Sequence, residues 1–150
     1  MGYDIDYRGL LMVFSGSYLG LWETGTGDTG LAHVSGLVGL ESLGLGGGPR
    51  FRITDAGFVH LGRLVNLKRL RLIETEITDV GLAHLRDLRS LEELELDEPL
   101  LTDGGILQLK GLPRLARLSL RRANVSDALV ADFQGLGVEV ISRGSYPSPR

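Results

Sequence analysis

Three histidines recur at one place in the sequence, each three residues after a glycine: His33, His60 and His84. Imidazoles brought into a row could bind a metal ion or transfer protons at neutral pH. No column of carboxylates accompanies this row, and Gln108 takes the next place in it. Duplication of a longer segment that carries one histidine explains the row more simply, so we predict no metal site.

A glycine string of the kind that binds dinucleotides runs over Gly25-x-Gly27-x-x-Gly30. Such glycines let a pyrophosphate approach the N-terminus of a helix. The next predicted strand, Leu43–Leu45, begins only ~13 residues after the string, in a unit that needs ~30 residues in total. The same place in a later copy reads Glu74 to Gly81. We therefore interpret the string as a glycine-rich loop and expect no nucleotide or other cofactor.

The remaining polar residues form no recognisable catalytic grouping in the sequence. Ser15 and Ser17 belong to predicted strands and the histidines to predicted helices, so they are not expected to form a catalytic group. The sequence also has no Gly-x-Ser-x-Gly turn. The acid pairs Glu92-Glu93 and Asp97-Glu98 are adjacent in sequence, so their side chains diverge. The chain has no cysteine, which excludes disulfides and thiolate sites. We predict that the protein is not an enzyme.

Composition limits the class of protein further. The 150 residues are 43% apolar and 23% charged, as in a soluble globular domain. A net charge of −3 argues against a nucleic-acid partner. The longest early apolar run, Leu10 to Phe14, is shorter than the ~7–15 residues of a secretion signal or the ~20 of a membrane span. We expect a cytoplasmic protein with no membrane partner.

A repeat of 24 residues dominates the sequence. It is marked by the pairs Thr54-Asp55, Thr78-Asp79, Thr102-Asp103 and Ser126-Asp127. Apolar residues follow in phase, and their columns include Leu64, Leu88, Leu112 and Leu136; Leu70, Leu94 and Leu118; and Leu72, Leu96 and Leu120. So many columns in register are not a product of chance.

Each unit divides into a strand and a short helix. Alternation at the end of the leucine motif predicts a strand with Leu94 and Leu96 inward and Glu93 and Glu95 outward. The Thr-Asp pair predicts a helix N-cap, in which the side-chain oxygen accepts a bond from a free backbone N–H. One unit cannot bury its own apolar stripe, so the copies must stack.

The pattern extends toward the N-terminus with one irregularity. Asp28 and Asp55 are 27 residues apart, so this unit carries three extra residues, which we place at Gly46-Gly47-Gly48-Pro49. Residues 1–16 do not fit the repeat and are expected to form an N-terminal cap. We predict a single domain over residues 1–141, with about five repeats, and a flexible C-terminal tail over 142–150.

The repeat resembles the leucine-rich repeat family through Leu67-x-x-Leu70-x-Leu72, Leu91-x-x-Leu94-x-Leu96 and Leu115-x-x-Leu118-x-Leu120. The Thr-Asp-x-Gly-Leu helix entry is similar to repeats of bacterial proteins and of F-box substrate receptors. The resemblance implies an α/β solenoid, a short arc with a parallel sheet on its concave face and short helices on its convex face. The family's ninth position, usually Asn, Cys or Thr, is here Thr75, Pro99 and Ala123. This departure predicts looser loops after Leu96 and Leu120.

Outward residues of neighbouring strands should lie side by side on the concave face. Adjacent strands are about 4.8 Å apart, so opposite charges can pair across them. The predicted rows are Arg69, Glu93 and Arg117; Arg71, Glu95 and Ser119; and Ile73, Asp97 and Arg121. We predict an inter-strand ladder of ion pairs that partly neutralises itself.

The same outward columns place Tyr18 and Trp22 on an early strand, beside Ser42, Gly44 and Gly46 on the next. Trp22, the single tryptophan, then stands over a flat glycine floor and forms an exposed apolar step. Alternatively, the cap residues Leu10 to Phe14 fold over Trp22 and bury it.

These features predict an interaction module that binds an unidentified protein partner on its concave face. The candidate binding residues are Tyr18, Trp22, Arg69, Arg71, Glu93, Glu95, Asp97, Arg117 and Arg121. Two alternatives stay open: a substrate-recognition subunit of a larger enzyme complex, and a structural fragment of a longer repeat array.

Overall fold

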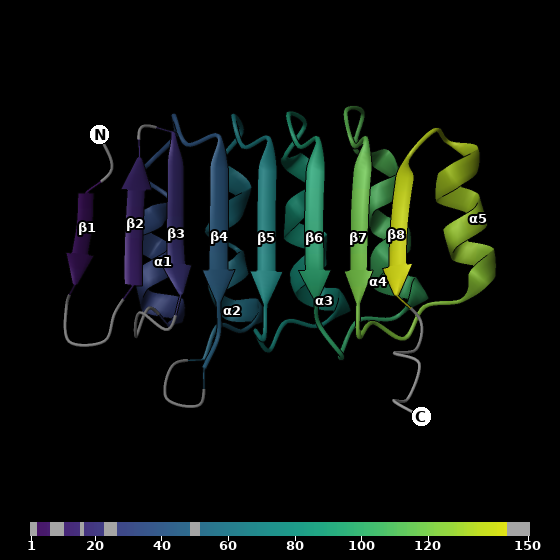
Figure 1. Ribbon diagram of the computed structural model, residues 1–150, viewed down its shortest axis with the longest axis horizontal. Helices are drawn as coiled ribbons and strands as arrows, with labels where there is room; N and C mark the ends of the chain where they lie inside the picture. Colours follow the sequence, from purple (N-terminus) through teal and green to yellow (C-terminus); the bar gives the residue numbers. More distant parts are fainter. Residues whose placement is uncertain (1–2, 7–10, 16, 23–26, 49–51, 144–150) are drawn as a thin grey trace, which may run out of the picture.

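A computed structural model describes residues 3–6, 11–15, 17–22, 27–48 and 52–143. The described strands form one sheet in chain order (Figure 1). They are β1 (Tyr3–Asp6), β2 (Leu11–Ser15), β3 (Tyr18–Trp22), β4 (Ser42–Gly46), β5 (Arg69–Ile73), β6 (Glu93–Asp97), β7 (Arg117–Arg121) and β8 (Glu139–Arg143). The pairs β1–β2 and β2–β3 are antiparallel, and every pair from β3 to β8 is parallel.

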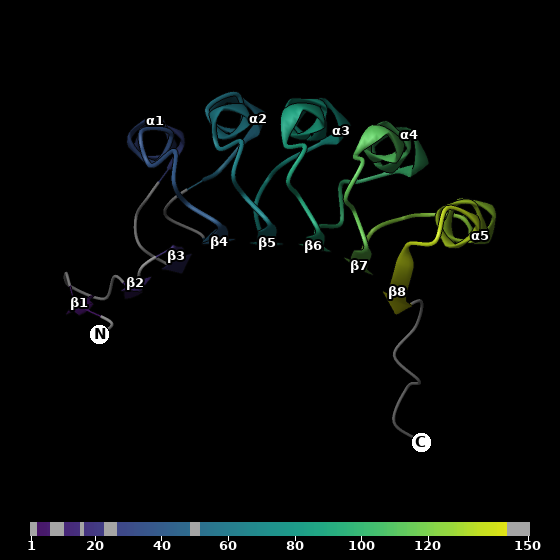
Figure 2. The same cartoon turned by 90° about the horizontal axis from the view of Figure 1, so that it is seen from above.

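One helical segment follows each strand from β3 to β7 and crosses back behind the sheet. The helices are α1 (Asp28–Val34), α2 (Asp55–Phe58), α3 (Asp79–Leu82), α4 (Asp103–Leu107) and α5 (Asp127–Gly135), with 3-10 turns at Leu61–Arg63, Ala83–Asp87 and Gln108–Gly111. Seen from above, the sheet bends away from the helices, which lie along its convex side (Figure 2). The predicted arc, with a concave sheet and a convex helical layer, is confirmed.

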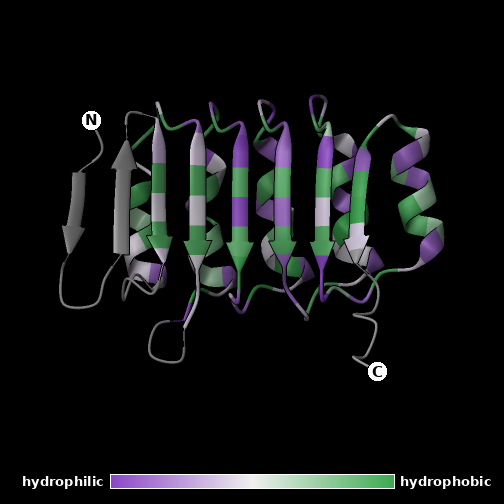
Figure 3. Ribbon diagram, in the orientation of Figure 1, coloured by the Kyte–Doolittle hydropathy of each residue, from purple (hydrophilic) through white to green (hydrophobic). Residues whose placement is uncertain are grey.

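The core is the layer between sheet and helices. The predicted register is confirmed: Leu70, Leu94 and Leu118 are partners across β5, β6 and β7, and each is at most 1% exposed. Figure 3 shows apolar bands side by side on neighbouring strands of the sheet. A fully buried leucine contributes ~1.5–3 kcal/mol relative to an exposed one. The repeated column therefore makes stacking of the units favourable.

The predicted N-caps are also confirmed. The hydroxyl oxygen of Thr78 accepts a bond from Val80 N at 3.2 Å, and Thr54, Thr102 and Ser126 cap their helices in the same way. The aspartates have a second role that the sequence did not predict. Asp55 accepts two bonds from the next unit, one from Thr78 N at 2.8 Å and one from Thr78 Oγ1 at 2.6 Å.

These bonds between units recur along the convex side. Thr54 donates to Asp28, Thr102 to Asp79, and Ser126 to Asp103, each through its backbone N–H and its hydroxyl. The bonds from Ser126 hold the pKa of Asp103 below its usual value. Each Thr-Asp pair therefore caps its own helix and also fastens it to its neighbours.

The ninth repeat position is Thr75, Pro99 and Ala123, and the eighth position, directly before it, adds one polar contact. Glu98 is fully buried, and its Oε1 accepts a bond from Thr75 N at 3.0 Å. Glu74 and Arg122 hold the position of Glu98 in the neighbouring units. Both adopt positive φ angles, 54° and 55°, and remain exposed. Glu98 does not adopt a positive φ, and it precedes Pro99, which restricts the backbone of the residue before it. The carboxyl group of Glu98 thus supplies a polar contact in a unit whose ninth residue, Pro99, has no polar side chain.

The two ends of the chain bear on the predicted boundaries. Within the predicted cap, β1 and β2 extend the sheet as two antiparallel strands. Leu11 is the partner of Trp22 across β2 and β3. Leu10 and the side chains of the cap lie outside the described residues, so burial of Trp22 by the cap stays a prediction. β8 ends at Arg143, and residues 144–150 of the predicted tail also lie outside the description.

Candidate functional site

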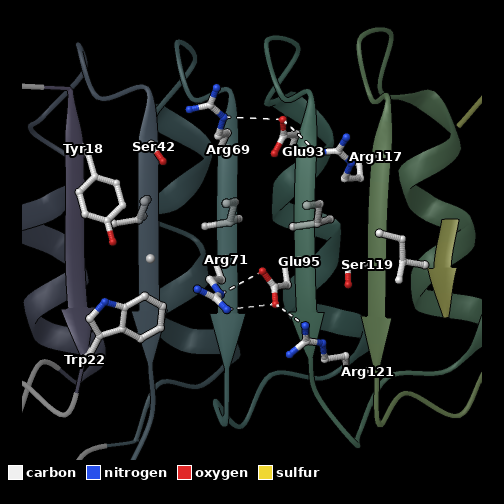
Figure 4. A pocket seen from close by; sticks show the side chains of 15 residues that line it. Tyr18, Trp22, Ser42, Arg69, Arg71, Glu93, Glu95, Arg117, Ser119 and Arg121 are labelled. Atoms are coloured by element: carbon white, nitrogen blue, oxygen red, sulfur yellow. Dashed lines mark hydrogen bonds and ion pairs between the residues drawn. The ribbon is translucent and has the colours of Figure 1, made fainter. Parts of the chain in front are cut away.

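The concave face of the sheet is hollowed along β3 to β7 (Figure 4). The hollow has a volume of about 410 Å³. Its polar and aromatic lining residues are Tyr18, Trp22, Ser42, Arg69, Arg71, Glu93, Glu95, Arg117, Ser119 and Arg121. The structure therefore brings eight of the nine predicted binding residues together, and Asp97 is the exception.

The first row of the predicted ladder is confirmed. Glu93 Oε1 lies 3.7 Å from Arg69 Nε and 3.6 Å from Arg117 Nη1. Arg117 Nε also lies 2.9 Å from Glu139 Oε2 on β8, and the two acids raise the pKa of Arg117. The signs alternate along four strands, so the charges in this row cancel.

The second row is also present, with one change of partner. Arg71 approaches Glu95 with two nitrogens, Nε at 3.0 Å from Oε2 and Nη2 at 3.3 Å from Oε1. Arg121 Nη2 lies 3.6 Å from Glu95 Oε1 (Figure 4). Two guanidinium groups thus share one carboxylate, and this row keeps one excess positive charge.

The predicted neighbours Asp97 and Arg121 are in register, but Asp97 pairs with a different arginine. Arg122 Nε lies 2.5 Å from Asp97 Oδ1, and Arg122 Nη2 lies 3.7 Å from Glu74 Oε1. The hydrogen bond to Asp97 raises the pKa of Arg122. Arg122 follows the end of β7, so strand alternation alone did not identify it. Its positive φ breaks the strand and changes the direction of the chain there.

Trp22 rests on the predicted glycine floor. Side chains at Gly44 or Gly46 would overlap its six-membered ring, and a Cβ on Gly20 would come within 2.7 Å of Tyr18 Oη and 2.8 Å of Trp22 Nε1. The indole is half-buried, and the Arg71 guanidinium carbon lies 5.7 Å from its ring centroid. At this distance a cation attracts the face of the ring. Part of the indole is therefore buried by the sheet itself, and the rest borders the arginine row.

Other candidate chemistry can be placed on the structure. His33 is exposed and His60 and His84 are half-buried on the convex side. Among the residues described, no three His, Asp or Glu side chains are grouped so that they could hold a metal ion.

Gly27 is the N-cap of α1, and Gly25 of the glycine string lies outside the described residues. None of the helices in the described ranges has the length and apolar character of a membrane span.

Comparisons with known proteins identify the fold. No protein-family model and no curated protein match the sequence. A crystal structure of an internalin (inlF) from Listeria monocytogenes strain 4b F2365, a leucine-rich repeat protein, has a similar fold, with a TM-score of 0.59 and 22% sequence identity. The match covers 77% of this chain and 32% of the internalin. The chain has the fold of a leucine-rich-repeat solenoid, and it spans about a third of the internalin's length.

Proposed function

We propose that this chain is a protein-interaction module and that its partner binds the concave face. The observation that supports this most is the hollow along β3 to β7, which combines a half-buried Trp22 with rows of arginine and glutamate. Tryptophan, tyrosine and arginine are enriched among the few residues that carry most of the binding energy in protein interfaces. The helices lie on the opposite side of the sheet, so a partner can reach these side chains directly (Figure 2).

We propose a non-catalytic role for the same face. Its carboxylates are engaged by arginines of neighbouring strands, as in Glu93 with Arg69 and Arg117. Ion pairs of this kind are ordinary structural contacts between neighbouring strands. The cytoplasmic location stays a prediction from the sequence.

The test compares capture of partners by the full chain and by matched variants. Proteins from a lysate of the source cells are retained on the immobilised chain, on the concave variant Trp22→Ala, and on the convex control Val80→Ala, whose side chain is 66% exposed. We expect specific partners to bind the wild type and the control and to be lost from Trp22→Ala. Equal retention by all three would contradict binding at the concave face. An enzyme among the retained proteins would favour the alternative of a recognition subunit.

A further inference from the structure

The hollow is more basic than the protein that carries it. Four guanidinium groups line it, those of Arg69, Arg71, Arg117 and Arg121, against the two carboxylates of Glu93 and Glu95. Because Glu139 on β8 pairs with Arg117, the two rows together keep an excess of one positive charge, whereas the chain as a whole carries a net charge of −3. A local field opposite in sign to the net charge selects partners by charge complementarity.

The excess is concentrated in the second row. Glu95, with 26% of its side chain exposed, lies between Arg71 and Arg121, which are 49% and 43% exposed. A guanidinium group has five N–H donors, and Arg121 places a single nitrogen near Glu95. Donors of this row therefore remain for a second carboxylate, which arginine can bind in a two-pronged geometry.

An aromatic surface adjoins the same row. The indole of Trp22 covers Gly44 and Gly46 on β4 and borders Arg71 on β5. Alternate strands such as β3, β5 and β7 are ~9.6 Å apart. An extended chain in the polyproline II form repeats its side-chain direction every three residues, or ~9.3 Å. A segment lying across the strands could place one residue on Trp22 and the third and sixth residues after it near Arg71 and Arg121.

We propose that the hollow binds an extended acidic segment of a partner protein, with an aromatic or aliphatic side chain on Trp22 and carboxylates on Arg71 and Arg121. This rests on the proposed function and specifies the chemistry of the partner. A nucleic acid fits less well, because the excess of one positive charge is small and acidic residues flank it, whereas nucleic-acid sites extend as basic stripes.

The proposal is tested by selecting random 12-residue peptides, displayed on phage, on the full chain. We expect the selected peptides to be rich in Asp and Glu, with one aromatic or aliphatic residue about three positions before an acid. Selection of neutral or basic peptides, or no selection at all, would overturn the proposal. If such peptides still depend on Trp22, the concave interface stands and its acidic specificity fails.

Variants separate recognition from general damage to the fold. For a selected acidic peptide, Arg71→Gln with Arg121→Gln should weaken binding about tenfold or more, because hydrogen bonds to charged groups are lost. The matched control, Arg63→Gln with Arg86→Gln on the helical side, removes the same charge and should leave binding unchanged. Glu95→Gln should strengthen binding, since it removes the carboxylate that competes for both arginines; weaker binding would contradict the proposal. A 12-nucleotide single-stranded DNA that binds more tightly than the peptides would also overturn it.

Discussion

The carboxylate of Asp55 occupies the space in which a side chain at Gly81 would have to lie. A Cβ added to Gly81 would overlap Asp55 Oδ1 and come within 3.2 Å of Asp55 Cγ. The same relationship joins Asp28 with Gly57, and Asp79 with Gly105. The glycine of each Thr-Asp-x-Gly motif therefore makes room for the aspartate of the preceding unit, which binds the threonine of the same motif.

Gly81→Ala should destabilise the protein, although the helix propensity of alanine is more favourable than that of glycine by about 1 kcal/mol. The added methyl group must displace Asp55 from Thr78, and overpacking of this kind costs ~1–3 kcal/mol. Urea unfolding measures the change. Gly135→Ala is the matched control, because its added Cβ has no atom within 4 Å other than those of its chain neighbours and its own helix backbone, and it should leave the free energy of unfolding unchanged or higher. A stabilised Gly81→Ala protein would show that the close contact does not constrain the helix.

The ladder of ion pairs predicts a difference between charge removal and charge reversal. Glu93 and Glu95 each lie between two arginines, and cross-strand pairs of opposite charge contribute ~0.2–1 kcal/mol each. Glu93→Lys with Glu95→Lys places like charges side by side and should lower the melting temperature more than Glu93→Gln with Glu95→Gln. Thermal unfolding followed by circular dichroism measures both. Equal melting temperatures would show that the ladder contributes nothing.

The sequence predicted those parts of the fold that repeat with a fixed period. Strand register, the leucine columns, the helix caps and the position of Trp22 over Gly44 all follow from the 24-residue phase. It did not predict the contacts that cross from one unit to the next outside the strands. The bond from Thr78 to Asp55 joins two helix entries, and its partners could be identified only after the units were stacked.

Residues that depart from the repeat were still harder to predict from the sequence. Glu98 sits at the position of Glu74 and Arg122, yet it alone of the three is buried. The signal was present in the Glu-Pro pair, because Pro99 restricts the backbone before it. Arg122 was missed for the opposite reason. It lies beyond the strand, and its side chain returns to Asp97 on β6.

The buried Glu98 predicts a pH dependence of stability. Burial raises its pKa from 4.5 to about 7, against the smaller opposing effects of Thr75 and Arg122. The folded protein therefore holds this proton more tightly than the unfolded chain does. The stabilisation is complete below about pH 4.5 and is lost as the pH rises to about 7, a change of ~3 kcal/mol at most. The carboxylate that remains leaves Oε2 buried without a hydrogen-bond partner among the described residues.

Glu98→Gln removes the charge and should raise the free energy of unfolding by ~2–3 kcal/mol near pH 8 and by much less near pH 4.5. Urea unfolding of wild type and variant at both pH values isolates this group from the other carboxylates. Glu74→Gln is the control, since Glu74 holds the same repeat position and is exposed, and its effect should be small at both pH values. An effect of Glu98→Gln that does not change with pH would contradict the raised pKa.

The fluorescence of Trp22 reports directly on the glycine floor, because it is the single tryptophan of the chain. A Cβ at position 44 would overlap the indole, with Trp22 Cη2 only 2.9 Å away, so Gly44→Ala should push the ring off the sheet. We expect a shift of the emission maximum to longer wavelength and stronger quenching by iodide than in the wild type.

Gly39→Ala is the matched control for that experiment, because its added Cβ has no atom within 4 Å other than those of its chain neighbours, and its spectrum should equal that of the wild type. Trp22→Ala should weaken binding of a concave partner by ~2 kcal/mol or more, while changing stability little. A Gly44→Ala protein that keeps its fold and the wild-type spectrum would contradict the contact between ring and floor. Loss of the fold in Trp22→Ala would instead show that the indole serves the N-terminal end of the solenoid rather than a partner.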